Sequence, residues 1–371
     1  MKIPFHKPNV TQKEIDSVVQ VIRSGWLTMG PKTIEFENKF KNFIGSNYAI
    51  SVNSATSALH LALSALGVVK GDEVIIPTNT FIATAEAVTY LGAVPILCDI
   101  EPQFHNIDTS KIEALITNNT KAIIPVHFGG NPCLMDEISL LAKKYNLKII
   151  EDAAHALPSY YNNRIIGSFS DAVCFSFYAT KTLSTGEGGM ITTNDKKIAR
   201  KIKLQRLHGI NRDSWDRYDN INDWYYEVVD LGYKYNTTDF QSALGIIQLE
   251  RLQCMKKERL RVAMQYYQAF KGKIDFVHGS SDNSSLHLFV IRVSNRDELY
   301  QKLKSKGIIT SVHFIPVHVH PFYKNKFSYN SKDFPIANNI FKKSLSLPIY
   351  PDLTIEQTEY VINNVLAYAV D

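Results

Sequence analysis

Residues 48–66 read YAISVNSATSALHLALSAL, and this stretch sets the pattern for the first half of the chain. Tyr48–Val52 is a short run typical of a strand. Between residues 55 and 66 the apolar side chains recur at a spacing that places them on one face of a helix. Ser54 suits the N-cap position of that helix, and Gly67 suits its C-terminal stop. The stretch therefore predicts a strand, a tight connection and a helix.

The same alternation of strands and helices continues to residue 150, after two helices predicted at 11–23 and 33–43. The predicted strands are 73–76, 94–98, 122–126 and 147–150, and the predicted helices are 81–91, 109–115 and 136–144. Alternation of this kind is typical of an α/β fold in which helices cover both faces of a mainly parallel sheet.

The second half of the chain is less regular. It predicts strands at 172–177 and 189–193, a helix at 195–207, an irregular loop at 208–232 and a long helix at 238–267 that is broken or bent near residue 254. From about residue 270 the pattern suits a smaller α/β domain. We therefore expect a large domain with a mixed, mainly parallel sheet over residues 1–245, and a small C-terminal domain over residues 246–371.

The composition is that of an ordinary globular protein, because 45% of the 371 residues are hydrophobic and 21% are charged. These fractions exclude a disordered or fibrous chain. The net charge of +5 is too small for the basic surface of a nucleic-acid-binding protein, but it suits a small anionic ligand such as a phosphate ester.

The N-terminus and the cysteines indicate a cytoplasmic protein. Residues 1–14 contain no apolar core of a signal peptide, and no uncharged apolar run reaches the roughly 18 residues that cross a membrane. The four cysteines, at 98, 133, 174 and 254, form no CxxC pair, so we expect no zinc ribbon. Free thiols in a reducing compartment are the expectation.

Two of the predicted strand ends carry residues that suit a phosphorylated, flat ligand. In an open α/β sheet, ligands bind beyond the carboxyl ends of the strands. Ala55 and Thr56 begin the helix after the first strand, where free backbone N–H groups attract a phosphate, although for this motif taken alone a plain N-cap at Ser54 is the favoured interpretation. Phe81 follows the second strand, where it either covers a flat cofactor or packs in the core at a helix start.

Two further strand ends carry ionisable residues. Asp152 follows the apolar run 147–150, so it either lies buried in the crevice beside a cationic partner or caps the next segment. Lys181 follows Ser176 in a turn of small residues, where loss of solvent would lower its pKa and free the amine as a nucleophile. A surface position is the common alternative for any lysine.

Taken together, the four strand ends indicate pyridoxal 5′-phosphate. This cofactor needs a phosphate site, a cover for its ring, a carboxylate at the pyridine nitrogen and a lysine that forms a Schiff base. The Gly-rich turn at 186–189 lacks the spacing and the context of a dinucleotide-binding fingerprint, and no P-loop sequence occurs.

The chain resembles the nucleotide-sugar aminotransferases of the DegT/StrS type, which are fold-type I pyridoxal-phosphate enzymes. The resemblance runs from Pro4 nearly to the C-terminus. It is carried by GWLTMGP at 25–31, EDAAH at 151–155, SFYATKTLSTGEGG at 176–189, GYKYN at 232–236 and LPIYP at 347–351. Tyr178 departs from the family pattern, in which His or Phe is more usual, and receives no role.

The resemblance implies a role for each of several residues. Lys181 matches the Schiff-base lysine, and Asp152 matches the partner of the pyridine nitrogen. The remaining matches are Phe81 to the ring-stacking aromatic, Ala55, Thr56 and Ser176 to phosphate binders, His155 to the residue beside the 3-hydroxyl, and Asn236 to a phosphate ligand from the neighbouring subunit. The match at Asn236 implies a homodimer with shared active sites.

The implied activity is transfer of an amino group from L-glutamate to a nucleotide-linked keto-6-deoxy sugar. Family members with His at the position of His155 tend to act on 4-keto sugars. The implied pathway builds either a surface polysaccharide, such as the O-antigen of lipopolysaccharide, or an antibiotic sugar. Two alternatives stay open, a pyridoxal-dependent sugar dehydratase and a non-catalytic regulatory protein of the same fold. The intact Lys181 favours transamination, because related dehydratases carry His there.

Two other groups of side chains suggest ligand contacts. His318 and His320 stand at i and i+2, which would place them on one face of a strand, but no convincing third metal ligand is near and we expect no metal. A substrate contact by His318, His320 and Tyr323 is the favoured interpretation. The aromatic loop, residues 208–232, either stacks on a nucleobase or sugar or packs at a dimer interface.

Overall fold

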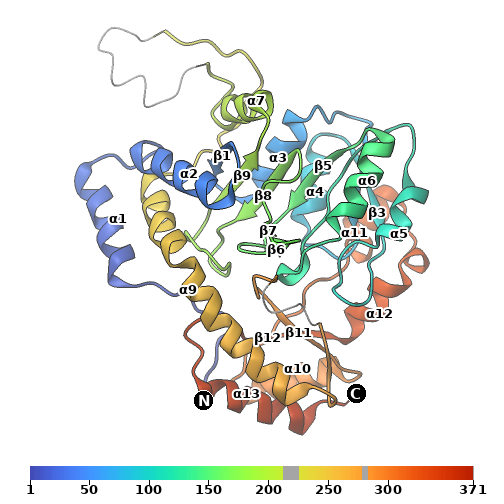
Figure 1. The fold of residues 1–371 in the computed structure, drawn as a ribbon. Helices are drawn as coiled ribbons and strands as arrows, with labels where there is room; N and C mark the ends of the chain where they lie inside the picture. The colour runs from blue at the N-terminus through green and yellow to red at the C-terminus, as the bar shows by residue number, and fades with distance from the viewer. Residues whose placement is uncertain (212–224, 278–282, 371) are drawn as a thin grey trace.

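A seven-stranded sheet forms the centre of the computed structural model, which describes residues 1–211, 225–277 and 283–370 (Figure 1). In spatial order the strands are β1 (Tyr48–Val52), β9 (Gly189–Thr193), β8 (Ala172–Ser176), β5 (Lys148–Asp152), β4 (Thr120–Ile123), β2 (Glu73–Pro77) and β3 (Val94–Cys98). Only β9 runs antiparallel to its neighbours, β1 and β8. The expected mixed, mainly parallel sheet is confirmed, although β4 ends earlier than predicted.

Helices cover both faces of this sheet. Successive side chains of a strand point to opposite faces, so Ile149 and Ile150 enter different cores. Ile150 packs with α3 (Ala55–Ala65), α4 (Ala83–Tyr90) and α7 (Lys196–Arg206). The opposite face is covered by α2 (Pro31–Ile44), α5 (Thr109–Ile112), α6 (Met135–Tyr145) and the first part of α9 (Asp239–Phe270). The two-sided cover explains why most positions of these strands are buried.

Local signals set the ends of the helices much as the sequence predicts. In α3, the Oγ of Ser54 accepts the backbone N–H of Ser57 at 3.1 Å. The first helix, α1 (Gln12–Ser24), ends at Gly25, whose φ of 77° is the left-handed conformation that glycine adopts at low cost. The helix expected at 109–115 is divided into α5 and a 3-10 turn, η1 (Glu113–Leu115).

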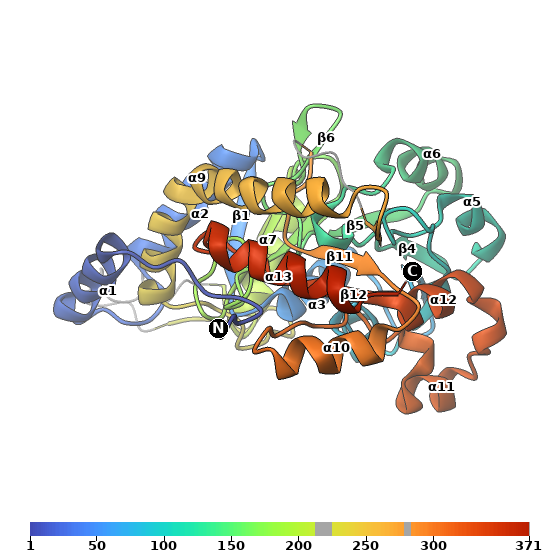
Figure 2. The same cartoon turned by 90° about the horizontal axis from the view of Figure 1, so that it is seen from below.

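A smaller antiparallel sheet lies below the main one. It contains β10 (Asp275–Phe276), β11 (Phe289–Arg292) and β12 (Ser344–Leu347). Its core is formed with the second half of α9, α10 (Arg296–Ser305) and α13 (Ile355–Tyr368), which lie together in Figure 2. The other elements are η2 (Phe128–Gly130), a hairpin of β6 (Tyr160–Tyr161) and β7 (Arg164–Ile165), η3 (Val317–Val319), α11 (Pro321–Phe327), η4 (Ser331–Asp333) and α12 (Pro335–Lys343).

The long helix α9 joins the two sheets without interruption. The predicted break near residue 254 does not occur, because Asp239–Phe270 forms one continuous helix that starts at a capping box of Thr238 and Gln241. The proposed domain boundary at residue 245 therefore falls inside a helix. Ile3 packs in the core of the small sheet and pairs with Ile308, so the N-terminal residues contact the small C-terminal unit.

No helix within residues 1–211, 225–277 and 283–370 has the length and apolar character needed to cross a membrane. In the same ranges the four cysteines are free thiols, and only Cys254 is exposed.

Candidate active site

A pocket with an empty volume of ≈ 1310 Å³, part of it open to solvent, lies at the carboxyl end of the sheet. Asp152 is the last residue of β5 and Ser176 the last of β8, so the parallel strands deliver both side chains to the same edge. The pocket brings together all the predicted catalytic and cofactor-binding residues except Asn236: Ala55, Thr56, Phe81, Asp152, His155, Ser176 and Lys181.

The N-terminus of α3 offers free donors to this pocket. Ser54 caps the helix by binding the N–H of Ser57, while the N–H groups of Ala55 and Thr56 donate to no acceptor in the described part of the chain. The backbone of Gly189 packs so closely here that a Cβ would lie 2.6 Å from the carbonyl carbon of Ser54. The cap and the anion site are thus compatible, since two N–H groups of the first turn remain available for a phosphate.

Asp152 is buried at the floor of the pocket. Its Oδ2 accepts a hydrogen bond of 2.8 Å from the Oγ1 of Thr84, and its Oδ1 accepts the N–H of Ala154 at 3.1 Å. Burial raises the pKa of Asp152, whereas these hydrogen bonds and the charge of Lys181 act in the opposite direction. The carboxylate is therefore buried with partners that favour its charged form.

Lys181 extends into the same pocket from the turn after β8. Its backbone N–H donates to the carbonyl of Tyr178 at 2.9 Å, which holds the turn. Burial lowers the pKa of Lys181 to about 8, and the charge of Asp152 partly offsets this effect. A substantial share of the amine is therefore neutral near pH 8, as a nucleophile and proton carrier requires.

His155 enters the pocket as a neutral imidazole. Burial, followed by the charges of Lys181 and His313, lowers its pKa well below the ordinary value. Its Nδ1 accepts the N–H of Gly129 at 3.3 Å, so the ring proton of the neutral form lies on Nε2. The ring of His155 lies 4.3 Å from that of His287, centroid to centroid, and stacks on Phe314 at 5.8 Å.

Phe81 lies over the pocket with 59% of its surface exposed, and this large exposed ring is free to cover a flat ligand. Its ring centroid is 5.9 Å from that of Phe314. Five further residues of this pocket were not predicted from the sequence: Phe5, Thr80, His287, His313 and Phe314. Phe5 belongs to the N-terminal segment, Thr80 precedes α4, and His287, His313 and Phe314 belong to the small C-terminal unit. No fixed spacing in the sequence relates these residues to Lys181.

The predicted substrate contacts lie elsewhere. His318 is fully buried, and its ring nitrogens contact Thr78 Oγ1 at 2.7 Å and Asn338 Oδ1 at 3.0 Å. His320 and Tyr323 do not line the pocket either, and Tyr323 packs in the core of the large sheet. The expected strand is a 3-10 turn, so the shared face for His318 and His320 does not form. Within the described ranges, no group of three or more His, Cys, Asp or Glu side chains is arranged to hold a metal.

Asn236 lies outside the pocket of its own chain. Its Nδ2 donates to the carbonyl of Thr237 at 2.9 Å, and its Oδ1 is buried without a hydrogen-bond partner in the described residues. Trp215, Tyr218 and Trp224 of the aromatic loop lie outside the described residues. Tyr225 and Tyr226 are described, and both side chains are exposed.

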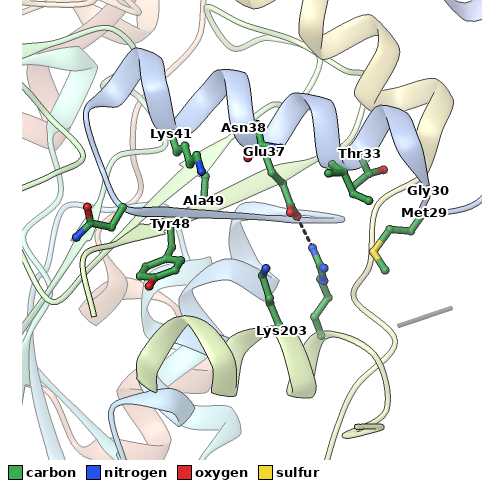
Figure 3. A pocket seen from close by; sticks show the side chains of 12 residues that line it. Met29, Gly30, Thr33, Glu37, Asn38, Lys41, Tyr48, Ala49 and Lys203 are labelled. Carbon is green, nitrogen blue, oxygen red and sulfur yellow. Dashed lines mark hydrogen bonds and ion pairs between the residues drawn. The ribbon is translucent and has the colours of Figure 1, made fainter. Parts of the chain in front are cut away.

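A second pocket lies at the edge of the main sheet, between α2, β1 and α7 (Figure 3). Here Glu37 accepts the N–H of Ser51 at 2.8 Å, and Arg206 donates to the carbonyl of Ser51 at 3.0 Å. Glu37 and Arg206 also form an ion pair at 2.5 Å. These side chains satisfy the open edge of β1, so their polar groups serve the fold.

Comparison with known proteins identifies the family. Residues 8–366 match the model of the DegT/DnrJ/EryC1/StrS aminotransferase family. The chain belongs to this family.

Relatives match along nearly their whole length. The spore coat polysaccharide biosynthesis protein SpsC of Bacillus subtilis is 46% identical over 374 residues, which cover 98% of this chain and 96% of the relative. The PLP form of the putative sugar aminotransferase Spr1654 of Streptococcus pneumoniae has a TM-score of 0.92 at 32% identity, covering 99% and 98% of the two chains. PseC of Helicobacter pylori, an aminotransferase involved in the biosynthesis of pseudoaminic acid, has a TM-score of 0.93 at 30% identity, covering 99% of each chain.

The protein is therefore a sugar aminotransferase that depends on pyridoxal phosphate, with the fold of its structural relatives. The residues of the pocket fit this cofactor. The free N–H groups of Ala55 and Thr56 suit its phosphate, Asp152 suits its ring nitrogen, and the amine of Lys181 suits its aldehyde. When bound, the cofactor supplies an electron sink for a carbanion at the donor carbon.

Proposed function

We propose that the protein transfers an amino group from L-glutamate to a nucleotide-linked 4-keto-6-deoxy sugar. The observation that carries the proposal is the position of Lys181, whose pKa is lowered to about 8, in the same pocket as the buried carboxylate of Asp152. An amine that is both neutral and protonated in comparable amounts near pH 8 can take up and return a proton at every turnover.

Each side chain of the pocket has one task in this proposal. The Nζ of Lys181 removes the proton from the α-carbon of the donor. Asp152 would keep the ring nitrogen of the cofactor protonated, and Phe81, exposed at the pocket, would cover the ring and exclude water. Because Nδ1 of His155 accepts the N–H of Gly129, its Nε2–H would be the group that donates to the 3-oxygen of the cofactor. The hydroxyl groups of Thr56 and Ser176 would bind the phosphate.

The relatives and His155 support the proposed sugar class. SpsC is named for spore coat polysaccharide biosynthesis, and PseC for the biosynthesis of pseudoaminic acid. His155 stands where family members that act on 4-keto sugars tend to carry histidine. We extend the proposal to the biosynthesis of a surface polysaccharide, in a cytoplasm whose reducing conditions suit the four free cysteines.

The proposal includes a homodimer in which Asn236 reaches the phosphate site of the partner subunit. Asn236 does not line the pocket of its own chain, and its buried Oδ1 lacks a partner in the described residues. Exposed apolar side chains on neighbouring segments support a covered surface here, among them Val228, Val229 and Leu231.

A coupled assay tests the proposed substrates. Purified protein is incubated with pyridoxal phosphate, L-glutamate and a panel of UDP-, dTDP- and GDP-linked 4-keto- and 3-keto-6-deoxyhexoses, and both 2-oxoglutarate and the amino sugar are measured. The proposal predicts oxoglutarate in a 1:1 ratio to amino sugar with a 4-keto substrate. Exclusive turnover of 3-keto sugars would overturn the assignment at C4, and release of ammonia without oxoglutarate would identify a dehydratase.

A further inference from the structure

Asp152 is held by a chain of two buried threonine hydroxyls. The Oγ1 of Thr84, in the first turn of α4, lies 2.8 Å from Oδ2 of Asp152, and the Oγ1 of Thr80 lies 2.8 Å from that of Thr84. Thr80 and Thr84 are at most 1% exposed. These contacts join the loop after β2 to the end of β5.

The direction of the chain follows from the number of protons. An ionised carboxylate only accepts hydrogen bonds, so the single hydroxyl proton of Thr84 points to Asp152. Thr84 therefore acts as the acceptor toward Thr80, and the proton of Thr80 points to Thr84. Both hydroxyl dipoles are aligned with their positive ends toward the carboxylate, and each hydrogen bond strengthens the other.

The carboxylate needs this support because it is buried. Burial raises its pKa, and the hydrogen bond from Thr84 is the largest opposing effect, followed by the N–H of Ala154 and the charge of Lys181. Lys181 is not a dependable counter-charge, since its own pKa is lowered to about 8. A neutral hydroxyl donor stabilises the charged form at every pH.

We propose that Thr84, oriented by Thr80, is a positioning residue that holds the carboxylate of Asp152 ionised and directed toward the ring nitrogen of the cofactor. The inference rests on the role proposed for Asp152 in the function above. The proposal predicts that loss of the Thr84 hydroxyl, which contacts Asp152, impairs the electron sink of the bound cofactor.

The test compares Thr84→Val, which keeps the shape without the hydroxyl, with Thr84→Ser, which restores the hydroxyl. Thr358→Val is the matched control, because Thr358 is equally buried on a helix, donates to the carbonyl of Thr354 and lies in the small unit. Each variant is measured for pyridoxal phosphate affinity of the apoprotein, for single-turnover rate with L-glutamate and for the pH dependence of that rate.

Thr84→Val is expected to lower both the cofactor affinity and the single-turnover rate by about ten- to a hundred-fold, the size of one hydrogen bond to a charged group. The acid limb of its rate profile is expected to move to higher pH, because the carboxylate protonates more easily. Thr84→Ser should recover most of both values, the KM for glutamate should change little, and Thr358→Val should match wild type. A Thr84→Val protein with wild-type affinity, rate and pH profile would overturn the inference.

Two further variants keep the outcome decisive. If Thr84→Val does not fold, Thr80→Val should show a smaller loss of cofactor affinity and rate, and wild-type values for Thr80→Val would contradict the hydroxyl chain.

Asp152→Asn separates the role of Thr84 from the role proposed for Asp152. If Asp152→Asn is impaired while Thr84→Val is normal, the positioning role alone fails. If Asp152→Asn is normal, the role of Asp152 fails first. In an Asp152→Asn background, Thr84→Val should lower the cofactor affinity and the single-turnover rate by less than twofold, because the carboxylate charge that Thr84 stabilises is absent.

Discussion

Asp239, the first residue of α9, accepts hydrogen bonds from both the N–H and the Oγ1 of Thr33, at 2.9 and 2.7 Å. The same carboxylate accepts the N–H groups of Gly30 and Lys32, so a side chain from α9 caps the N-terminus of α2. Gly30 supplies no side-chain cap of its own. The contact joins α2, which covers one face of the main sheet, to α9, the helix that connects the two sheets.

Asp239→Ala is expected to lower the free energy of unfolding by about 2–3 kcal/mol, because several buried donors lose a charged acceptor at once. Urea unfolding of the purified apoprotein measures the change. Glu359→Ala, at an exposed position on α13, serves as the control and should change the free energy by about 0.5 kcal/mol or less. Equal effects of the two substitutions would contradict the cross-helix cap.

Asp152→Asn is expected to reduce the rate of the glutamate half-reaction by about a hundredfold or more and to weaken cofactor binding. An amide cannot stabilise a protonated ring nitrogen, and the electron sink depends on that proton. Stopped-flow absorbance gives the rate, and titration of the apoprotein gives the affinity. A near-normal rate would reduce Asp152 to a cap for the segment that begins at Ala154.

Lys181 makes the stability of the apoprotein depend on pH. Because its pKa is lowered to about 8 in the folded state, the folded protein binds this proton less readily than the unfolded chain does. The resulting destabilisation is fully present below pH 8 and disappears as the pH rises from 8 toward the ordinary lysine value of about 10.4.

Lys181→Met removes this group and should therefore stabilise the apoprotein most at low pH. We expect the stability difference between variant and wild type to shrink by about 2 kcal/mol between pH 7 and pH 9.5. Denaturant unfolding at a series of pH values measures the slope, with Lys306→Met, at an exposed lysine, as the control. A difference that stays constant across this range would mean that Lys181 is not desolvated.

Much of the site could be predicted because it lies at strand ends. The apolar runs before Asp152 and Ser176 locate the carboxyl edge of a parallel sheet, and chemistry in such sheets gathers there. Thr84 could not be found in this way, because its role depends on the direction of one hydroxyl in the first turn of a helix. Likewise, His313 and Phe314 reach the pocket only through the packing of the small unit against the large sheet.

The errors also have physical reasons. The shared face predicted for His318 and His320 required a strand, but the chain there forms a 3-10 turn. Both ring nitrogens of His318 are engaged in hydrogen bonds, one with Thr78 and one with Asn338. The break considered in α9 near residue 254 does not form, because buried residues recur along the helix from the α2 side to the small sheet and hold it continuous.

Asn236 offers a test of the proposed shared site by mixing two disabled subunits. Lys181→Ala and Asn236→Ala chains, co-expressed with different tags, should give mixed dimers in which one site holds both intact residues. Random pairing makes half of the dimers mixed, so about a quarter of all sites should work at a limiting cofactor concentration. If Asn236 serves its own chain, the mixture shows only the average of the two parent activities.

The measurement that tests the central claim most directly is the half-reaction of the purified, cofactor-loaded protein with L-glutamate alone. Wild-type protein is predicted to lose its visible absorption and to release one 2-oxoglutarate per subunit. The Lys181→Ala protein, with its folding verified by circular dichroism, is predicted to release none. The amine of Lys181 is both the anchor of the cofactor and the carrier of the proton, so both signals should vanish together. Oxoglutarate release by Lys181→Ala at a substantial fraction of the wild-type rate would contradict the account.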